Sequence, residues 1–344
     1  MKLPLLLTTL LLTPTLAIAE PVTIHAVGDI MLAGSGTGTY QRRGYDYPFA
    51  ATAELLQKAD IVIGNLEAPL ARTGEEFTGK KFRFRVDPAA GQALKNAGFT
   101  HLTLANNHIL DFGAAGLAQT REALTELAIG FSGAGPDLAT ANAAHYSEVN
   151  GRKIAFLSYS LVYPEEFFAT SSRAGTVPGY TPYFTAAIKK ARESADFVIV
   201  SFHWGGEGLD TPKEYQKDAG HRAIDAGADV VLGHHPHVLQ GIERYRQGVI
   251  FYSLGNFAFG STSRKSDRSV IARIVLDEGI KEVEVIPLNV LNREVRYQPQ
   301  PLQGPRAAAV AGYLDRLSRS LDTAVGETAG RFLVEPASRE IATR

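Results

Sequence analysis

The sequence predicts an α/β fold, because short apolar segments alternate with segments of helical periodicity along most of the chain. Hydrophobic residues make up 45% of the composition, which is enough for a sizeable core in a chain of 344 residues. Several apolar segments end directly in Asp, Glu, Asn or His side chains. Alternating strands and helices favour a largely parallel sheet, and such sheets bind ligands at the carboxyl ends of their strands.

The expected strands are short and rich in Val, Ile, Leu and Phe. In chain order they cover residues 22–27, 60–63, 102–104, 153–159, 196–202, 230–232 and 249–254, followed by two strands of antiparallel type at 269–276 and 283–288. Residues 147–149 and 153–159 are expected to form a hairpin, because Asn150-Gly151 between them is a strong turn signal. The expected helices cover residues 49–59, 88–97, 114–127, 137–144, 183–194, 212–226 and 305–320.

Residues 81–86, Lys-Phe-Arg-Phe-Arg-Val, alternate basic and apolar side chains with a period of two. This alternation predicts a strand with one aromatic and one cationic face. Arg83 and Arg85 on the cationic face are candidate substrate-binding residues for an anion, although a solvated edge strand that uses its charges against aggregation explains the pattern equally well. Residues 162–182, rich in Pro, Gly and Ser, are expected to form a lid or substrate loop.

The N-terminus has the pattern of a secretory signal peptide, in which Lys2 precedes an apolar run that ends in Ala17-Ile18-Ala19. We therefore expect cleavage after residue 19 and secretion across the inner membrane, to the periplasm or the extracellular space; a retained membrane anchor is the alternative. The absence of Cys excludes thiolate ligands and disulfides. A net charge of −1 gives no reason to expect a nucleic acid partner.

Three of the nine histidines, His234, His235 and His237, follow the apolar residues 230–232. A His-rich turn explains this run by itself, but other predicted strands end in a similar way, at Asp29, Glu67, Asn107-His108 and His203. Because the strand ends of a parallel sheet converge, we expect these side chains to meet. Nitrogen, carboxylate and amide donors without sulfur suit divalent Mn, Zn or Fe, and their number suits two ions that share a bridging group. Such a site predicts metal-assisted hydrolysis.

Six segments, taken in order, resemble the CapA family of poly-γ-glutamate and capsule synthesis proteins: GDIML at 28–32, GNLEAPL at 64–70, LANNHILDFG at 104–113, HWGGE at 203–207, GHHPHVLQ at 233–240 and YSLGNFAF at 252–259. The resemblance implies a calcineurin-like four-layer αββα sandwich of two mixed β-sheets flanked by helices. It implies a domain of the metallophosphatase type over residues 20–290, with residues 291–344 as a C-terminal helical extension.

Carried over by position, the resemblance also implies roles for individual residues. It implies six metal ligands: Asp29 for the first metal, Glu67 in the place of the bridging aspartate, Asn107 for the second metal, His203 as the lone metal-binding His, and His235 with His237 as the terminal His-x-His pair. His108 would be the general acid or a transition-state hydrogen-bond donor, and Asp111, one turn away, would fix its ring. His234 falls where the phosphoesterases carry Gly, so its role stays open, and it is a candidate substrate-binding residue.

The chain departs from the phosphoesterase pattern at Met31, where an Asp-x-His motif would place an imidazole, and thioether sulfur is a poor ligand for a hard ion. Two functions therefore stay open. One is an exported metal-dependent hydrolase of phosphoester or amide bonds, acting on an anionic envelope polymer or a phosphoester substrate. The other is a non-catalytic component that holds or exports a capsular polymer beside membrane synthases. A nucleotide phosphatase would share the metal site, and the oligomeric state is not determined at this level.

Overall fold

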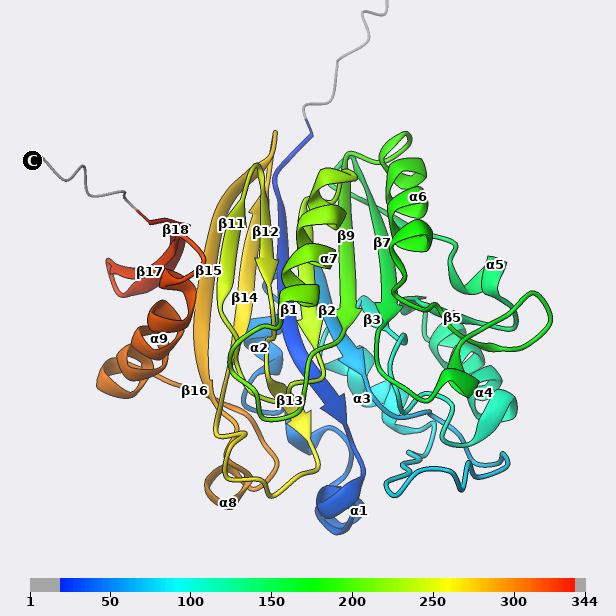
Figure 1. The fold of residues 1–344 in the computed structure, drawn as a ribbon. Helices are drawn as coiled ribbons and strands as arrows, with labels where there is room; N and C mark the ends of the chain where they lie inside the picture. Colours follow the sequence, from blue (N-terminus) through cyan, green and yellow to red (C-terminus); the bar gives the residue numbers. More distant parts are fainter. Residues whose placement is uncertain (1–18, 338–344) are drawn as a thin grey trace, which may run out of the picture.

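The computed structural model describes residues 19–337 and arranges them as two β-sheets packed face to face, with helices on both outer surfaces (Figure 1). The expected signal peptide, residues 1–19, lies outside the described residues except for Ala19. Within residues 19–337, no helix combines the length and the apolar character that crossing a bilayer requires.

In the larger sheet, the strands on one side of the N-terminal strand β1 (Val22–Met31) pair in parallel, and the long strands on its other side pair antiparallel. Its strands, in spatial order, are β17 (Thr323–Thr328), β18 (Arg331–Pro336), β15 (Ile280–Asn289), β14 (Arg268–Leu276), β1, β2 (Ile61–Leu66), β3 (His101–Thr103) and β4 (Gly130–Ser132). Two short strands lie beside this path, β13 (Asn256–Phe259) on β1 and β16 (Gln300–Pro301) on β15.

The smaller sheet has a parallel centre and antiparallel edges. Its strands, in spatial order, are β11 (Ile242–Tyr245), β12 (Gly248–Phe251), β10 (Val230–His234), β9 (Phe197–His203), β7 (Arg152–Ser160) and β6 (His145–Val149). A separate pair of short strands consists of β5 (Ala134–Gly135) and β8 (Gly175–Thr176).

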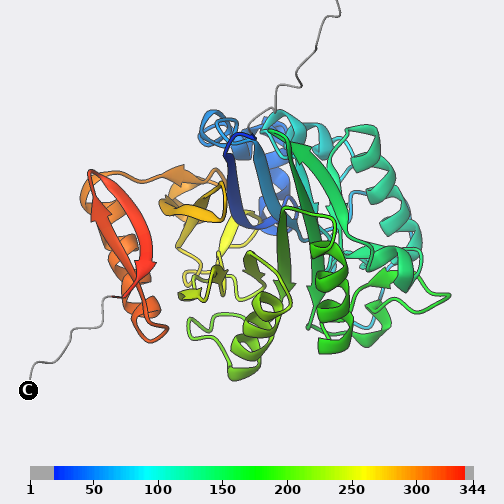
Figure 2. The same cartoon turned by 90° about the horizontal axis from the view of Figure 1, so that it is seen from above.

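The helices fall into groups that cover different surfaces of the sheets. They are α1 (Thr37–Arg43), α2 (Ala53–Leu56), α3 (Ala90–Asn96), α4 (Gly113–Glu126), α5 (Leu138–Ala141), α6 (Thr181–Arg192), α7 (Glu214–Asp225), α8 (Asn292–Val295) and α9 (Gly304–Arg319). Viewed from above in Figure 2, the cyan to teal helices α3 and α4 and the green helices α6 and α7 lie on opposite sides of the two sheets.

The order of layers follows from side chains that alternate along fully buried strands. In β9, Phe197 and Ile199 enter the core between the sheets, whereas Val198 and Val200 enter the core under α6 and α7. Because successive side chains of a strand point to opposite faces, an unbroken apolar run is what a strand covered on both faces requires. A third core, with Leu94 of α3 and other side chains, fills the space between the larger sheet and its helices. The expected four-layer αββα sandwich is confirmed.

Three expectations from the sequence need correction. The strands form two mixed sheets, and not the single largely parallel sheet that their alternation with helices favours. The predicted strand over residues 81–86 is wrong: this segment has no strand neighbour apart from an isolated bridge between Val86 and Leu70. Residues 291–344, expected to be helical, contain α8 and α9 but also the hairpin β17–β18, which joins the larger sheet through β15.

Candidate metal centre

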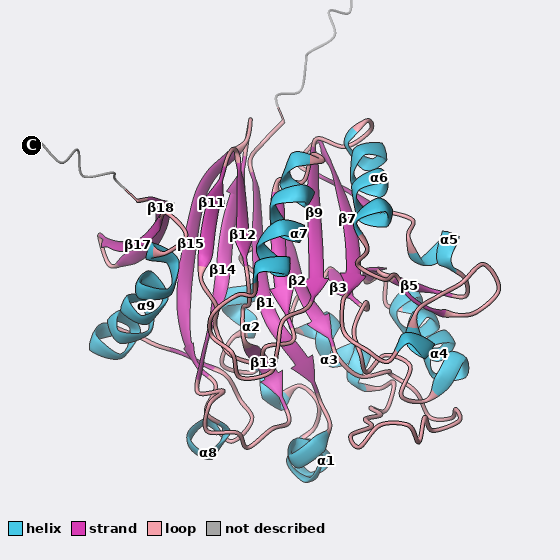
Figure 3. Ribbon diagram, in the orientation of Figure 1, coloured by secondary structure: helices cyan, strands magenta, loops and turns pink. Residues whose placement is uncertain are grey.

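The predicted metal ligands lie at one edge of the sandwich, at which strands of both sheets end. In Figure 3 the arrowheads of β1, β2, β7 and β9 point to this same edge. Asp29 pairs with Asn65 in the parallel ladder of β1 and β2, and His203 pairs with His234 in the ladder of β9 and β10. Among the predicted metal ligands, the carboxylates thus come from the larger sheet and the imidazoles from the smaller one.

A close approach of two backbones fixes the position of Asp29. A Cβ atom on Gly28 would lie 1.9 Å from the carbonyl oxygen of Gly255, so only glycine fits there. The approach allows the Asp29 amide to donate a hydrogen bond of 2.9 Å to that same carbonyl. Gly28 is therefore required by the position of Asp29 and not only by the strand.

Asp29 is fully buried and is surrounded by donors. Its Oδ1 accepts a hydrogen bond of 2.9 Å from Asn65 Nδ2, and its Oδ2 accepts one of 3.2 Å from the His235 amide. His234 Nδ1 lies 3.2 Å from Oδ1, and His237 Nδ1 lies 3.2 Å from Oδ2. Burial alone would raise the pKa of the Asp29 carboxyl, but the His234 and His237 imidazoles hold that pKa well below its usual range. Asp29 is thus an anion in the folded protein.

Glu67 is the carboxylate that two groups of candidate ligands share. One group consists of Glu67, His203 and His235, the other of Asp29, Glu67 and His237, and within each group the ligand atoms lie within 4.8 Å of one another. Glu67 Oε1 lies 3.6 Å from His203 Nε2 and 3.8 Å from His237 Nε2. Burial and the neighbouring Asp29 raise the pKa of the Glu67 carboxyl well above its usual range.

The imidazoles of His203 and His235, which form one group with Glu67, are suited to bind a cation because burial keeps them neutral. Burial, reinforced by the nearby His235, lowers the pKa of His203 well below its usual value. Burial and the neighbouring His237 lower the pKa of His235 to about 3. Asn107 Oδ1, 3.0 Å from His203 Nε2, adds an amide oxygen to this group.

The turn that carries His235 and His237 holds both residues in the left-handed region, with φ of 92° for His235 and 57° for His237. A non-glycine residue held in this region costs on the order of 1–3 kcal/mol, and such residues concentrate at functional sites. His237 Nδ1 also lies 2.9 Å from Asn256 Oδ1 on β13. Burial would lower the pKa of His237, but Glu67 and Asp29 raise it to about 9.

His108 and Asp111 lie beside this group as the resemblance implies. His108 Nδ1 is 2.6 Å from Asp111 Oδ2, and Asp111 is fully buried. Lys80 Nζ lies 2.7 Å from Asp111 Oδ1 and 3.1 Å from His108 Nδ1, and it also donates to the Asn107 carbonyl. Burial is the main cause that lowers the pKa of both His108 and Lys80.

Two side chains that the sequence analysis did not select organise the site. Asn65 Nδ2 donates to Asp29 and, at 3.3 Å, to Glu67 Oε2, so one amide aligns both carboxylates. Asn65 Oδ1 accepts a hydrogen bond of 3.0 Å from Asn106 Nδ2, and Asn106 Oδ1 accepts one from the His108 amide. The motif Gly64-Asn65-Leu66-Glu67 is a signal that could have identified Asn65. Lys80 is the other, and no motif marks it.

The three candidate substrate-binding residues do not share a surface. Arg83 Nε donates 2.8 Å to Glu76, and the guanidinium of Arg85 lies 4.4 Å from the ring centroid of Phe112. Their cationic face does not form, because residues 81–86 are not a strand. His234 is 1% exposed and faces Asp29, so its side chain is closed off from a substrate in solution.

The donors present fit a divalent cation. Glu67 Oε1 and His235 Nδ1 are buried without a hydrogen-bond partner, although buried polar atoms are almost always paired. Both belong to residues of the candidate groups, and the donor set of imidazole, carboxylate and amide oxygen suits Zn, Mn or Fe. A shared cation would satisfy these orphaned atoms.

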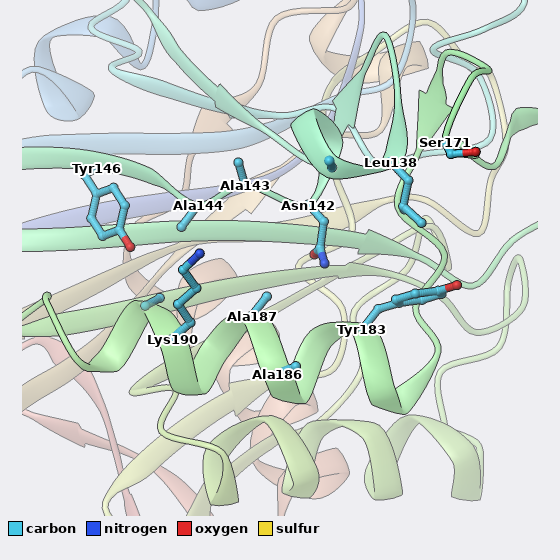
Figure 4. Close-up of a pocket in the computed structure, with 12 residues that line it drawn as sticks. Leu138, Asn142, Ala143, Ala144, Tyr146, Ser171, Tyr183, Ala186, Ala187 and Lys190 are labelled. Atoms are coloured by element: carbon cyan, nitrogen blue, oxygen red, sulfur yellow. The ribbon is translucent and has the colours of Figure 1, made fainter.

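A large cavity of about 670 Å³ lies elsewhere, between α5 and α6, and Figure 4 shows the residues that line it. Its wall is formed mainly by small apolar side chains, with Tyr146, Tyr183 and Lys190 at its margins. None of the predicted site residues lines it. The predicted metal ligands and His108 thus lie at the strand ends and not in this cavity.

Fold and site together define an αββα protein with a buried group of carboxylates and imidazoles that can hold a metal ion. Residues 23–261 match the family described as "Bacterial capsule synthesis protein PGA_cap", and the chain belongs to this family. The resemblance to CapA proteins is thereby confirmed.

Relatives with known names cover most of the chain. It is 35% identical over 279 residues to "Capsule biosynthesis protein CapA" of Bacillus anthracis, which covers 79% of this chain and 68% of that protein. It is 33% identical over 267 residues to "PGA biosynthesis protein CapA" of Bacillus subtilis (strain 168), covering 77% and 70%. A solved structure of NAD nucleotidase (NadN) from Haemophilus influenzae is similar with a TM-score of 0.46 and 12% identity, covering 86% of this chain and 63% of that one.

Proposed function

We propose that the protein is a metal-dependent hydrolase of the bacterial cell envelope that cleaves a phosphoester or amide bond in an anionic polymer such as poly-γ-glutamate. The observation that carries this proposal is that Glu67, a buried carboxylate with an unpaired oxygen, belongs to two donor groups at once. Two adjacent cation positions bridged by one carboxylate are typical of hydrolases that activate water against a phosphoryl or carbonyl centre.

The residues that would hold two Mn, Zn or Fe ions divide between the two positions. Asp29, Glu67 and His237 would hold the first, and Glu67, Asn107, His203 and His235 would hold the second. A cation bound there would supply Lewis-acid polarisation of a phosphoryl or carbonyl oxygen. The net negative charge of Asp29 and Glu67 would be overcompensated by two divalent ions, which favours an anionic substrate.

The proton chemistry falls to His108. Because Asp111 engages Nδ1 at 2.6 Å, Nε2 is the ring nitrogen available to give a proton to the leaving group. Asp111 orients the ring, and Lys80 holds Asp111 from the opposite side at 2.7 Å. Burial, which lowers the pKa of His108, makes the protonated form a stronger acid toward the leaving group.

The envelope setting of the proposal comes from the relatives and from the N-terminus. The named relatives are capsule and PGA biosynthesis proteins, and residues 1–19 have the pattern of a signal peptide. We therefore include secretion to the periplasm or extracellular space, and a membrane synthase complex as a partner, in the proposal.

A non-catalytic, polymer-binding role is the second candidate, and Met31 favours it. This side chain is 1% exposed at the position where the resemblance places an imidazole, so the first metal position lacks one ligand. A site too weak to hold its metal would leave a protein that binds a polymer without cleaving it. Chelation separates the two roles, because a binding protein of this kind would keep its polymer without metal.

The experiment measures the metal content and turnover of purified protein with a panel of nucleotides, phosphosugars and γ-glutamyl peptides. We expect about two Mn or Zn ions per chain, and His108→Ala should lower kcat by about 10²–10⁴-fold without loss of metal. His235→Ala should lose both metal and turnover. His221→Ala is the matched control, because this imidazole pairs with Glu243 away from the site. Full activity of His108→Ala and His235→Ala would exclude the hydrolase.

A further inference from the structure

The loop that follows β9 carries the motif His203-Trp204-Gly205-Gly206-Glu207, whose last residue has no role in the site described so far. Glu207 is exposed, yet its carboxylate lies within 4.8 Å of the ring nitrogens of His235 and His237, and these atoms form a third donor group. We propose that Glu207 is a metal ligand that completes the first metal position in place of the imidazole missing at Met31. This inference rests on the proposed function, because it presupposes that the site binds metal.

The first position has fewer protein donors than the second. The second has four protein donors, Glu67, Asn107, His203 and His235, whereas the first has only Asp29, Glu67 and His237. Protein sites for Zn and related ions use at least three protein ligands, and closed sites use four. The buried thioether of Met31 is too soft to serve a hard ion.

The other imidazole nearby does not fill this gap. His234 Nδ1 approaches only Asp29 Oδ1, and within residues 19–337 His234 belongs to none of the donor groups. Glu207 in contrast forms a donor group with His237, a ligand of the first position, and with His235, a ligand of the second position that already has four donors. Its carboxylate is of the donor class that hard divalent ions prefer.

The backbone holds Glu207 beside the His235-Pro236-His237 turn. The Trp204 amide donates a hydrogen bond of 3.1 Å to the His234 carbonyl, and the Gly208 amide donates one of 2.8 Å to the Pro236 carbonyl. The loop is therefore bonded to the turn on both sides of Glu207. Gly205 has φ of 89° and Gly208 has φ of 71°, a conformation that glycine adopts without strain. The proximity of Glu207 to the histidines is therefore built into the loop.

The charge of Glu207 supports ligation. Glu207 is exposed and lies beside His235 and His237, at the solvent side of a site proposed to receive an anionic polymer. A free carboxylate there would repel such a substrate. Bound to a cation, it would instead reduce the excess positive charge left by two divalent ions against Asp29 and Glu67, and still leave the site net positive.

Metal stoichiometry tests the assignment without reference to activity. Wild type, Glu207→Gln and the control Glu214→Gln, an exposed acid that pairs with Lys217, are loaded with Mn²⁺ or Zn²⁺, dialysed and measured by elemental analysis and titration calorimetry. We expect about two ions in wild type and in Glu214→Gln, and in Glu207→Gln a loss of one ion or a weakening of one of the two affinities by at least about 10–100-fold. The double variant Met31→His with Glu207→Gln should recover the lost ion.

The outcomes separate this inference from the proposed function. If wild type and Glu207→Gln bind two ions with equal affinities, Glu207 is not a ligand while the metal site stands. Equal affinities together with a raised KM in Glu207→Gln would make it a substrate contact and would likewise overturn the assignment. If wild type binds no metal, both the assignment and the proposed hydrolase fall.

Discussion

Lys80 Nζ lies 2.7 Å from Asp111 Oδ1, while His108 Nδ1 lies 2.6 Å from the other oxygen of the same buried carboxylate. Asp111 Oδ2 also accepts 2.8 Å from the Phe84 amide, and the Asp111 carbonyl accepts 2.9 Å from the Phe77 amide. Asp111 thus holds the irregular segment around Lys80 in place and also orients His108, the proposed proton donor. The position of the segment and the geometry of His108 are coupled through Asp111.

From this coupling we expect Lys80→Met to impair both stability and turnover. Removal of the ammonium leaves the buried Asp111 charge with fewer partners, and an unsatisfied buried group costs about 1–3 kcal/mol. Turnover should fall by about tenfold or more through misorientation of His108, with metal content unchanged. Urea unfolding and kcat measure the two effects. Lys81→Met is the control, because Lys81 is exposed. A Lys80→Met protein that matches this control in both measurements would show that the coupling is unimportant.

Removal of metal should destabilise the wild-type protein. A ligand that binds only the folded state at a thousandfold excess over Kd adds about 4 kcal/mol of stability, which in a domain of this size corresponds to roughly 10 °C in Tm. We expect chelation to lower the Tm by about this amount and Mn²⁺ to restore it. His235→Ala should show a much smaller response in the same thermal scan. An identical Tm with and without chelator would argue against an occupied site.

Asn65→Asp should make the stability of the protein depend more strongly on metal. The Asn65 amide donates to Asp29 at 2.9 Å and to Glu67 at 3.3 Å, so the variant would replace a shared donor by a third buried carboxylate. Without metal, like charges in a buried site repel, and we expect the chelated variant to unfold several degrees below chelated wild type. With Mn²⁺ the difference should shrink or reverse. If Asn65→Asp has the same Tm as wild type both with chelator and with Mn²⁺, the proposed role of the Asn65 amide is contradicted.

His101 should make the protein less stable in acid. Its ring is buried and stacks on Phe156, with 4.2 Å between the two ring centroids. Burial, with a smaller effect of His145, lowers the pKa of His101 well below its usual 6.5. The folded state therefore keeps His101 neutral while the unfolded state takes up a proton below its own pKa. The contribution of His101 to the free energy of unfolding is fully present above pH 6.5. It is lost as the pH falls below 6.5, by up to about 1.4 kcal/mol per pH unit.

His101→Gln should remove this contribution, because glutamine does not titrate and can still reach Ser132, which lies 3.0 Å from His101 Nε2. Urea unfolding of metal-free protein from pH 7.5 to 5 measures the slope of the unfolding free energy for wild type and variant. A slope that is the same in both proteins would rule out His101 as its source.

The sequence could place the candidate metal ligands at one edge because each follows an apolar strand. Asp29, Glu67 and His203 stand directly at or after fully buried segments, and the buried segments themselves are visible as runs of Val, Ile and Leu. The direction of a parallel strand fixes which end its last residue occupies. Local sequence was therefore enough to select these side chains, although not to show that they come from two different sheets.

Residues 81–86 show where local pattern fails. Period-two alternation produces a strand only when a neighbouring strand offers its backbone, and here the neighbours are the Asp111 carboxylate and the ring of Phe112. Arg83 and Arg85 consequently lose their common face, while Lys80, just outside the pattern, reaches the site. Nothing in the order of residues distinguishes these three cations.

The sequence by itself determined the family, and only through that family the αββα layers, together with the residues that end at the site, because ordered motifs and apolar runs are local properties of the chain. Only the tertiary structure decided how these residues are placed relative to one another: that Glu67 belongs to two donor groups, that Asn65 donates to two carboxylates, and that Glu207 lies beside His235 and His237. These relationships depend on the distances between side chains from separate sheets and loops. Such distances are set by how the sheets pack on one another, and no spacing along the chain encodes them.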